Sequence, residues 1–181
     1  MNLEEKKISG EIIYNGKILT LIKDKVLCPN GNTSFREVVL HNGGAAILCI
    51  TKDNLVYLVK QFRYPYNEVM YEIPAGKLEL NENPYDAALR EFEEETGNKA
   101  KRLIDLGCIY PSCGYTSEKI YLFLANDFTI SKQNLDSDET LEVVLMPLDK
   151  VEEMVLKGEI KDSKAICALY RYNLLKKNGK I

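Results

Sequence analysis

The chain has 181 residues, of which 45% are hydrophobic and 28% are charged, and this is the balance of an ordinary globular domain. The length fits one domain, or one domain with a small appendage, and the composition excludes disordered, collagen-like and coiled-coil classes. The net charge of -3 supplies no long-range attraction for nucleic acid or anionic lipid, so we expect neither as a partner.

The sequence also limits the compartment. The longest apolar run, at 45–50, is far shorter than the roughly 18 residues that a membrane helix needs. The first ten residues are too charged for a secretory signal. The five cysteines are an odd number without a Cys-x-x-Cys pair, which fits a reducing environment. We therefore expect a cytoplasmic protein.

The N-terminal part of the chain predicts β-strands. Asn15-Gly16 lies between two apolar segments and predicts a tight hairpin, because this dipeptide tolerates the positive φ angles of a type I′ turn. A Pro-Asn-Gly sequence at 29–31 predicts the next turn. A sheet of residues 1–40 is too small to be stable alone, so we expect it to pack on the rest of the protein or on a second copy.

Further strands follow along the chain. We expect the first of them to continue the N-terminal strands as a meander, with a turn at Asp53-Asn54. The expected strands are a buried run at 45–50, then 55–62, 104–110, 120–125 and 141–146.

A change of apolar period predicts a helix in the middle of the chain. Asn83 can cap it, Pro84 suits its first position, and Gly97 ends it. Two more helices are expected near the C-terminus, over 150–157 with Asp149 as cap and over 164–176 with Ser163 as cap.

The central helix carries its acidic residues at the unfavourable end. Glu91, Glu94 and Glu95 lie in its last two turns, where the helix dipole disfavours each carboxylate by about 0.3–1 kcal/mol. Their spacing places them on one face, where like charges repel. Arg90 can reach Glu94, but this leaves Glu91 and Glu95 facing each other. A divalent cation would complete the charge balance, although the helix alone fits a solvated acidic face as well.

The spacing around this helix decides between these alternatives. The fixed positions would coincide by chance on the order of once in a million sequences. They are Gly76, then Glu82 after five intervening residues, then Arg90-Glu91-Phe92 after seven, then Glu94-Glu95 after one, and Gly97 after one more. This pattern resembles the Nudix box. Asn98 departs from the pattern, because the family usually has an apolar residue there, and we expect any consequence in the packing just after the helix.

The resemblance implies a fold and a reaction class. The expected fold is of the α/β (α+β) class, an α/β/α sandwich with a mixed sheet and, here, a small N-terminal antiparallel sheet. It implies a Nudix hydrolase domain over 41–181 and a β-sheet region over 1–40 that forms a homodimer. Nudix hydrolases cleave a nucleoside diphosphate that is linked to another moiety.

Segments outside the box are similar to the ADP-ribose pyrophosphatase branch of the family. They are Arg36–Val39, Gln61–Pro65, Glu72–Lys77 and Pro111–Glu118. The branch implies a small nucleoside diphosphate sugar as substrate, with ADP-ribose hydrolysed to AMP and ribose 5-phosphate. GDP-mannose or NADH as substrate, and a non-catalytic ADP-ribose sensor, stay open as alternatives.

The resemblance also assigns roles to residues. Magnesium, with Mn²⁺ as a possible substitute, would be held by Glu91, Glu95, Glu94, Glu139 and the backbone carbonyl of Ala75. Glu82 and Arg90 would orient this cluster. Glu139 would also position or deprotonate the attacking water, with Asp138 as the rival residue and a solvated acidic loop as the alternative without a function.

Arginine suits the phosphates because its planar fork binds two oxygens at once. Arg36 and Arg63, near the ends of predicted strands, are the candidates, and surface salt bridging is the alternative use of each. The resemblance completes the expected substrate-binding set with Glu72, Leu78, Ser112, Gly114 and Glu118.

Overall fold

The computed structural model describes residues 2–137 and 139–181, which fall into two compact units. The smaller unit contains the residues up to Gly43 together with Tyr110–Lys119, and the larger unit contains Gly44–Ile109 and Ile120–Ile181. In the described part of the chain, no helix has the length and apolar character needed to cross a membrane.

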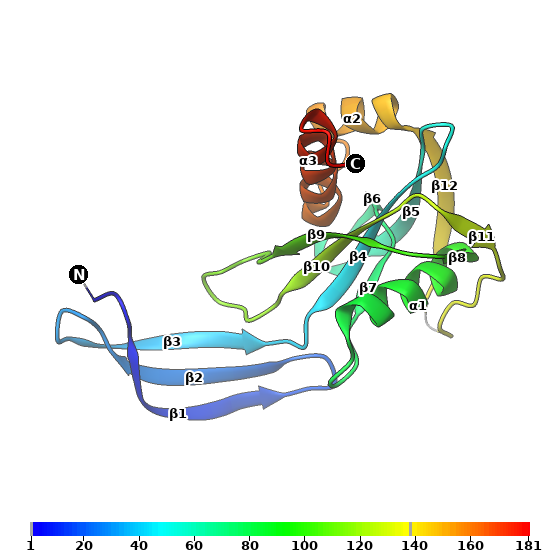
Figure 1. Cartoon of the computed structure of the whole chain (residues 1–181). Helices are drawn as coiled ribbons and strands as arrows, with labels where there is room; N and C mark the ends of the chain where they lie inside the picture. The colour runs from blue at the N-terminus through cyan, green and yellow to red at the C-terminus, as the bar shows by residue number, and fades with distance from the viewer. Residues whose placement is uncertain (1, 138) are drawn as a thin grey trace. The chain divides into compact units, whose positions relative to one another are not determined.

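The smaller unit is an antiparallel sheet with one attached loop. Its strands follow the chain in the order β1 (Lys6–Asn15), β2 (Thr20–Leu27) and β3 (Thr33–Leu40), drawn in blue in Figure 1. The loop at 110–119 is fastened to β3, because Val39 N donates to Tyr115 O at 2.8 Å and Ser117 N donates to Val39 O at 2.9 Å. The predicted N-terminal antiparallel sheet is thus present.

The first turn lies where the sequence predicts it, but its type is different. Asn15 pairs with Thr20, so residues 16–19 form the loop, and neither Asn15 nor Gly16 has a positive φ. A hydrogen bond from Gly16 N to Leu19 O, 2.9 Å long, closes this loop instead. The prediction of a type I′ turn is therefore wrong. The next turn, at 29–31, is confirmed.

The larger unit is built on a mixed sheet, seven-stranded in the described residues, in the order β12-β5-β4-β10-β9, with β6 on β5 and β7 on β4. Only β4 and β10 run parallel. The strands are β4 (Gly44–Ile50), β5 (Leu55–Arg63), β6 (Glu68–Glu72), β7 (Ala75–Lys77), β9 (Ile104–Ile109), β10 (Ile120–Ala125) and β12 (Leu141–Pro147). The expected meander is wrong at the step from β3 to β4, because these strands lie in different sheets. The turn at Asp53-Asn54 and the antiparallel pairing of β4 with β5 are confirmed.

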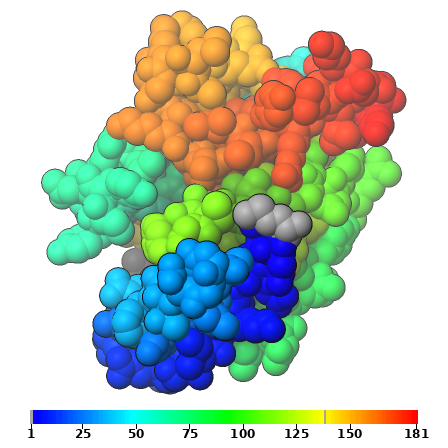
Figure 2. Space-filling view, turned by 90° about the vertical axis from the view of Figure 1, so that its left-hand side faces the viewer, coloured from blue at the N-terminus to red at the C-terminus, as the bar shows by residue number. Residues whose placement is uncertain are grey.

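Helices cover both faces of this sheet. Alternate residues of β4 show the two layers: Ala45, Ile47 and Cys49 belong to the core shared with α1, and Ala46, Leu48 and Ile50 to the core shared with α2 and α3. The predicted α/β/α sandwich is confirmed, and α2 and α3 form one side of the unit in orange to red (Figure 2). The bounds are α1 (Pro84–Thr96), α2 (Leu148–Leu156) and α3 (Ser163–Lys177), with η1 (Tyr64–Tyr66), β8 (Asn98–Ala100) and β11 (Phe128–Ile130) as short elements.

The ends of α1 follow the sequence signals. The Asn83 side chain accepts from Tyr85 N at 2.8 Å, and Gly97 ends the helix with a φ of 66°. Asn98, the departure from the family pattern, is buried, and its Nδ2 donates to Thr96 O at 3.1 Å. The polar side chain after the helix is therefore satisfied where the family has an apolar one.

The predicted caps of the last two helices are wrong, by two residues for α2 and by one for α3. α2 begins at Leu148 without a side-chain cap, so Asp149 lies inside its first turn. α3 begins at Ser163, and its cap is Asp162, whose carboxylate accepts from the backbone of Lys164 and Ala165. An extended Asp with two free acceptor oxygens satisfies more of the unpaired N–H groups than a serine hydroxyl can.

Candidate active site

Arg90 gathers three carboxylates beside α1. Its Nε and Nη2 donate to the two oxygens of Glu82, each at 3.0 Å, and its Nη1 donates to Glu91 at 2.8 Å and to Glu94 at 3.0 Å. These Arg90 hydrogen bonds hold the pKa of Glu82 below its ordinary value. The contact with Glu94 was expected, but Arg90 also binds Glu91, so the guanidinium compensates more of the charge than helix spacing alone indicates.

Glu95 is the most deeply buried acid of this group, with 3% of its surface exposed. Its Oε2 accepts from Ala75 N on β7 at 2.9 Å. Burial raises the pKa of Glu95 to about 8, the Ala75 amide opposes this shift, and the charges of Glu91 and Glu139 add to it. Within the described residues, the ionised form of this carboxylate accepts a hydrogen bond from a backbone amide but from no cationic side chain, and the charge of Arg63 acts on it without a hydrogen bond.

Gly76 explains how Glu91 fits against β7. A Cβ atom at Gly76 would lie 1.8 Å from the carboxyl carbon of Glu91, a distance that no real side chain tolerates. Burial raises the pKa of Glu91, Arg90 opposes this, and the charges of Glu94 and Glu139 reinforce it. The first glycine of the box is thus the residue that lets a carboxylate approach the strand backbone.

The loop after β11 is tied to the C-terminal end of α1. A Cβ atom at Gly97 would lie 2.9 Å from Gln133 N, so glycine permits this close approach as well as the left-handed turn. The hydrogen bonds satisfy carbonyls that a helix end leaves unpaired. They are Ser131 N to Gly97 O at 2.7 Å, Gln133 Nε2 to Glu95 O at 2.6 Å and Asn134 N to Glu94 O at 2.9 Å.

The same loop leads to Glu139. The negative charge of Glu139 acts on the pKa of both Glu91 and Glu95, so the structure brings this distant acid to the helix cluster. Asp138, the rival candidate for the loop acid, lies outside the described residues. The choice between the two loop acids stays a prediction.

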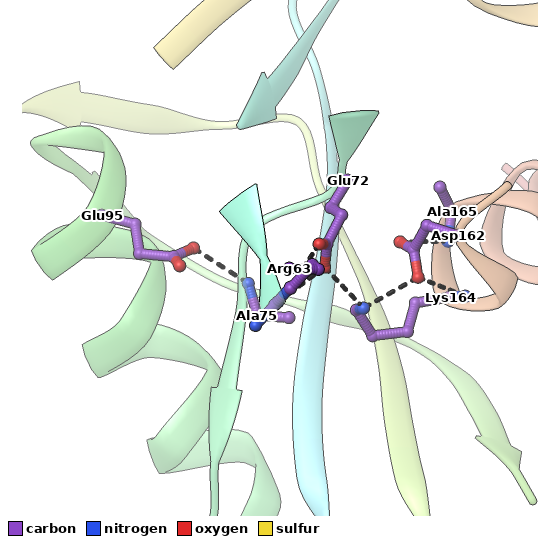
Figure 3. Close-up of polar contacts among 7 residues, drawn as sticks. All are labelled: Arg63, Glu72, Ala75, Glu95, Asp162, Lys164 and Ala165. Carbon is purple, nitrogen blue, oxygen red and sulfur yellow. Dashed lines mark hydrogen bonds and ion pairs between the residues drawn. The ribbon is translucent and has the colours of Figure 1, made fainter. Parts of the chain in front are cut away.

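A second buried ionic cluster lies next to the first (Figure 3). Arg63 on β5 binds both oxygens of Glu72 on β6, with its Nε at 2.5 Å and its Nη2 at 2.7 Å. Lys164 Nζ donates to Glu72 at 2.9 Å and to Asp162 at 2.8 Å. Arg63 and Glu95 also shift each other's pKa, so Arg63 lies within electrostatic reach of both clusters.

Sequence reasoning named Arg63 and Glu72 as substrate-binding residues, and it missed Lys164 and Asp162. Glu72 and Lys164 are 92 positions apart in the chain, and no local pattern joins them. The one available signal was the acid directly before the last predicted helix, and we assigned that cap to Ser163. The two acids and two bases balance each other within the cluster.

Comparison with known proteins identifies the family of this chain. The model of the NUDIX domain matches residues 40–169. This chain belongs to the Nudix family. It is 42% identical over 170 residues to an ADP-ribose pyrophosphatase of Bacillus subtilis (strain 168), covering 93% of this chain and 92% of that protein.

Two further matches cover nearly the whole chain. A methanol dehydrogenase activator of Bacillus methanolicus is 40% identical over 169 residues, covering 92% of this Nudix chain and 91% of that protein. The crystal structure of an ADP compounds hydrolase has the same fold, with a TM-score of 0.85 over 100% of both chains at 21% sequence identity.

The remaining predicted residues of this Nudix protein are divided between the two units. In the larger unit, Leu78 is buried in the core shared with α1. In the smaller unit, Arg36 on β3 forms an ion pair with Glu5, and Glu118 Oε1 lies 3.7 Å from His41 Nδ1. Ser112 and Gly114 lie in the loop at 110–119 of the same unit.

The donor chemistry of the Nudix helix fits a hard divalent cation. The candidate ligands are carboxylates and one backbone carbonyl, which are the oxygen ligands that Mg²⁺ prefers. Burial raises the pKa of both Glu91 and Glu95, and neighbouring carboxylates add to the rise. As they stand, no three His, Cys, Asp or Glu side chains of the described residues are arranged to hold a metal ion. Arg90 occupies one oxygen each of Glu91 and Glu94.

Proposed function

We propose that this Nudix protein hydrolyses the pyrophosphate bond of ADP-ribose, with Mg²⁺, to AMP and ribose 5-phosphate. The observation that carries the proposal is the acidic cluster at the end of α1, where Glu95 is buried and the charges of Glu91 and Glu139 add to the rise of its pKa. The 42% identity to a protein named ADP-ribose pyrophosphatase, over nearly the whole of both chains, supports the substrate.

Glu91, Glu95 and the backbone carbonyl of Ala75 would hold the cation, with Glu94 and Glu139 assisting. Mg²⁺, or Mn²⁺ in its place, neutralises charge that develops on the phosphates and lowers the pKa of bound water towards neutrality. Fixed carboxylates on a helix suit this role because the helix keeps their spacing.

The other residues of the site orient these ligands and the substrate. The paired hydrogen bonds between Arg90 and Glu82 hold the guanidinium, which in turn holds Glu91 and Glu94. We assign to Glu139 the removal of the proton from the attacking water, because it comes from a separate loop that reaches the same cluster. We assign to Arg63 the binding of phosphate oxygens.

We also assign a homodimer interface to the smaller unit. Its β1–β3 sheet and its first turn expose several large apolar side chains, and a second copy of the chain would cover them. More than half of the surface is exposed for each of Ile8, Ile12, Ile13, Tyr14, Ile18 and Phe35. Light scattering on the purified protein tests this assignment, and a monomer at micromolar concentration would contradict it.

We place the enzyme in the cytoplasm. All five cysteines lie within the described residues and are free, which suits a reducing compartment. Fractionation of cells that produce the tagged protein tests this placement.

The substrate is tested with a panel of nucleotides. ADP-ribose, GDP-mannose and NADH are each incubated with the protein and Mg²⁺, and release of the mononucleotide is measured with and without a chelator. We expect the highest kcat/KM for ADP-ribose and no turnover after chelation. A preference for either other nucleotide would contradict the substrate, and turnover without a divalent cation would contradict the metal assignment.

A further inference from the structure

Lys164 is a buried lysine at the start of α3 that the proposed reaction does not use. Its side chain is 15% exposed, and its Nζ lies between Glu72 at 2.9 Å and Asp162 at 2.8 Å. Burial by itself lowers the pKa of a lysine, but Asp162 and Glu72 raise the pKa of Lys164 above its ordinary value, so the side chain stays charged.

The ionic cluster as a whole needs a reason other than stability. Desolvating charged groups is costly, and a set of well-packed apolar side chains of similar volume is often as stable as a buried ion pair. Lys164 alone cannot be exchanged for methionine without cost, because Glu72 and Asp162 would keep their charges. The lysine therefore points to a requirement for a fixed geometry around Glu72.

That geometry concerns Arg63. Glu72 uses both oxygens to hold Nε and Nη2 of Arg63, and the additional bond from Lys164 prevents the carboxylate from rotating away. The remaining nitrogen, Nη1, makes no hydrogen bond within the described residues, and the Arg63 side chain is 39% exposed. Figure 3 shows Arg63 between Glu72 with Lys164 on one side and Ala75 with Glu95 on the other.

We propose that Lys164 is a positioning residue for substrate binding: anchored by Asp162, it fixes Glu72, which directs the Arg63 guanidinium at the diphosphate beside the carboxylate cluster. This inference rests on the proposed function, because the diphosphate is the ligand that Arg63 would meet. Lys164 itself acts only through Glu72 and Arg63.

The test is the steady-state kinetics of Lys164→Met with ADP-ribose and Mg²⁺. We expect KM to rise about tenfold while kcat stays within about threefold, because a misdirected arginine loses binding that ground state and transition state share. An unchanged KM in the folded variant overturns the proposal. If wild-type protein does not hydrolyse ADP-ribose, the proposed function fails, and the same KM comparison is made with the panel nucleotide that it does hydrolyse.

Lys161 offers a matched control. Lys161 precedes α3 and joins it to β6 as Lys164 does, through Glu68 at 2.7 and 3.0 Å, but this pair is exposed. Glu68 lies opposite Arg63 in the pairing of β5 with β6 but, within the described residues, makes no side-chain hydrogen bond to it. Lys161→Met breaks an ion pair between the same two segments, and we expect KM and kcat within about twofold of wild type. A KM rise equal to that of Lys164→Met would show that any link between these segments matters, against the proposal.

A double-mutant cycle tests the route through Arg63. In an Arg63→Gln background, Lys164→Met is expected to change kcat/KM by no more than about twofold, because the group that it positions is gone. Independent losses that multiply in the double variant would overturn the proposal.

A further variant separates positioning from folding. Lys164→Met leaves Asp162 buried without a cation, so we combine it with Asp162→Asn, which keeps a helix cap and removes the charge. We expect the melting temperature to recover towards wild type while KM stays raised. Recovery of KM together with stability would mean that Lys164 is structural only.

Discussion

Glu95 and Glu72 are the same residue type at the same exposure, 3% each, yet their pKa values move in opposite directions. Glu95 faces other carboxylates, and the nearest group that stabilises its ionised form is a backbone amide. Glu72 lies between Arg63 and Lys164. The comparison shows that burial alone does not decide the charge of an acid. Within the described residues, Glu95 has no hydrogen-bonded cation, whereas Glu72 has two.

The largest effect on activity is expected when the charge of Glu95 is removed. Glu95→Gln keeps the shape and the acceptor for Ala75 N but removes the charge that would hold the cation. We expect kcat/KM to fall at least about a hundredfold with the fold intact. Kinetics and circular dichroism measure both.

Glu93→Gln is the matched control, because Glu93 lies two positions away on α1 and binds Ser131 and Lys99 instead. We expect its activity to stay within about twofold of wild type. Unchanged turnover of Glu95→Gln would refute the metal assignment.

Glu139 contributes to the same unbalanced cluster from a separate loop. For Glu139→Gln we expect kcat to fall about a hundredfold with little change in KM, because general-base catalysis acts on the transition state. Asp138→Asn is measured beside it. If Asp138→Asn produces the fall in kcat and Glu139→Gln does not, the assignment of the loop base moves by one residue.

The free energy of unfolding of the metal-free protein should depend on the protonation of Glu95. Because the folded pKa of Glu95 is raised to about 8, its proton stabilises the fold at low pH, and this contribution is lost as the pH rises from the ordinary pKa of 4.5 through about 8. From pH 6 to pH 7, wild type should lose about 1.4 kcal/mol relative to Glu95→Gln, or about 3–6 °C in melting temperature. Thermal melts with a chelator measure this, and parallel pH profiles of the two proteins would contradict it.

The balanced cluster predicts the opposite pH dependence. Burial raises the pKa of Glu72. Arg63 and Lys164 lower it by a larger amount, so the net pKa lies below the ordinary value. Its stabilising contribution is present above that ordinary pKa and is lost as the pH falls through the folded pKa. The difference in melting temperature between wild type and Glu72→Gln should therefore shrink on acidification from about pH 5 to pH 3. A constant difference would mean that Glu72 is not charged in the fold.

Local signals in the sequence predicted helix α1 well. Asn83, Pro84 and Gly97 act within one or two turns of the helix, so their effects are visible without the rest of the chain. The alternation of buried residues in β4 was seen only as an apolar run, because both faces of this strand are covered. The short strands β8 and β11 were missed, because three residues carry no measurable period and their pairing joins distant segments.

Most of the contacts that complete the site join segments that are far apart in the chain. Local sequence patterns could not predict these contacts. Arg90 and Glu94 are one helical turn apart, so their contact was predictable. The contact between Glu72 and Lys164 depends on how α3 packs on the sheet. The resemblance to the Nudix family supplied the expectation of an acid in the late loop, because no local pattern connects Glu139 to a helix that ends at Thr96.

The attachment of residues 131–134 to the end of α1 has a practical meaning for protein engineering. A designer who transplanted the 76–97 segment into another scaffold would import the carboxylates without the donors that satisfy Gly97, Glu95 and Glu94 carbonyls. The graft would fray in its final turn, where the reactive acids lie. A transferable segment has to include residues 131–134 as well. The smallest unit that can be transplanted therefore consists of two separate stretches of the chain.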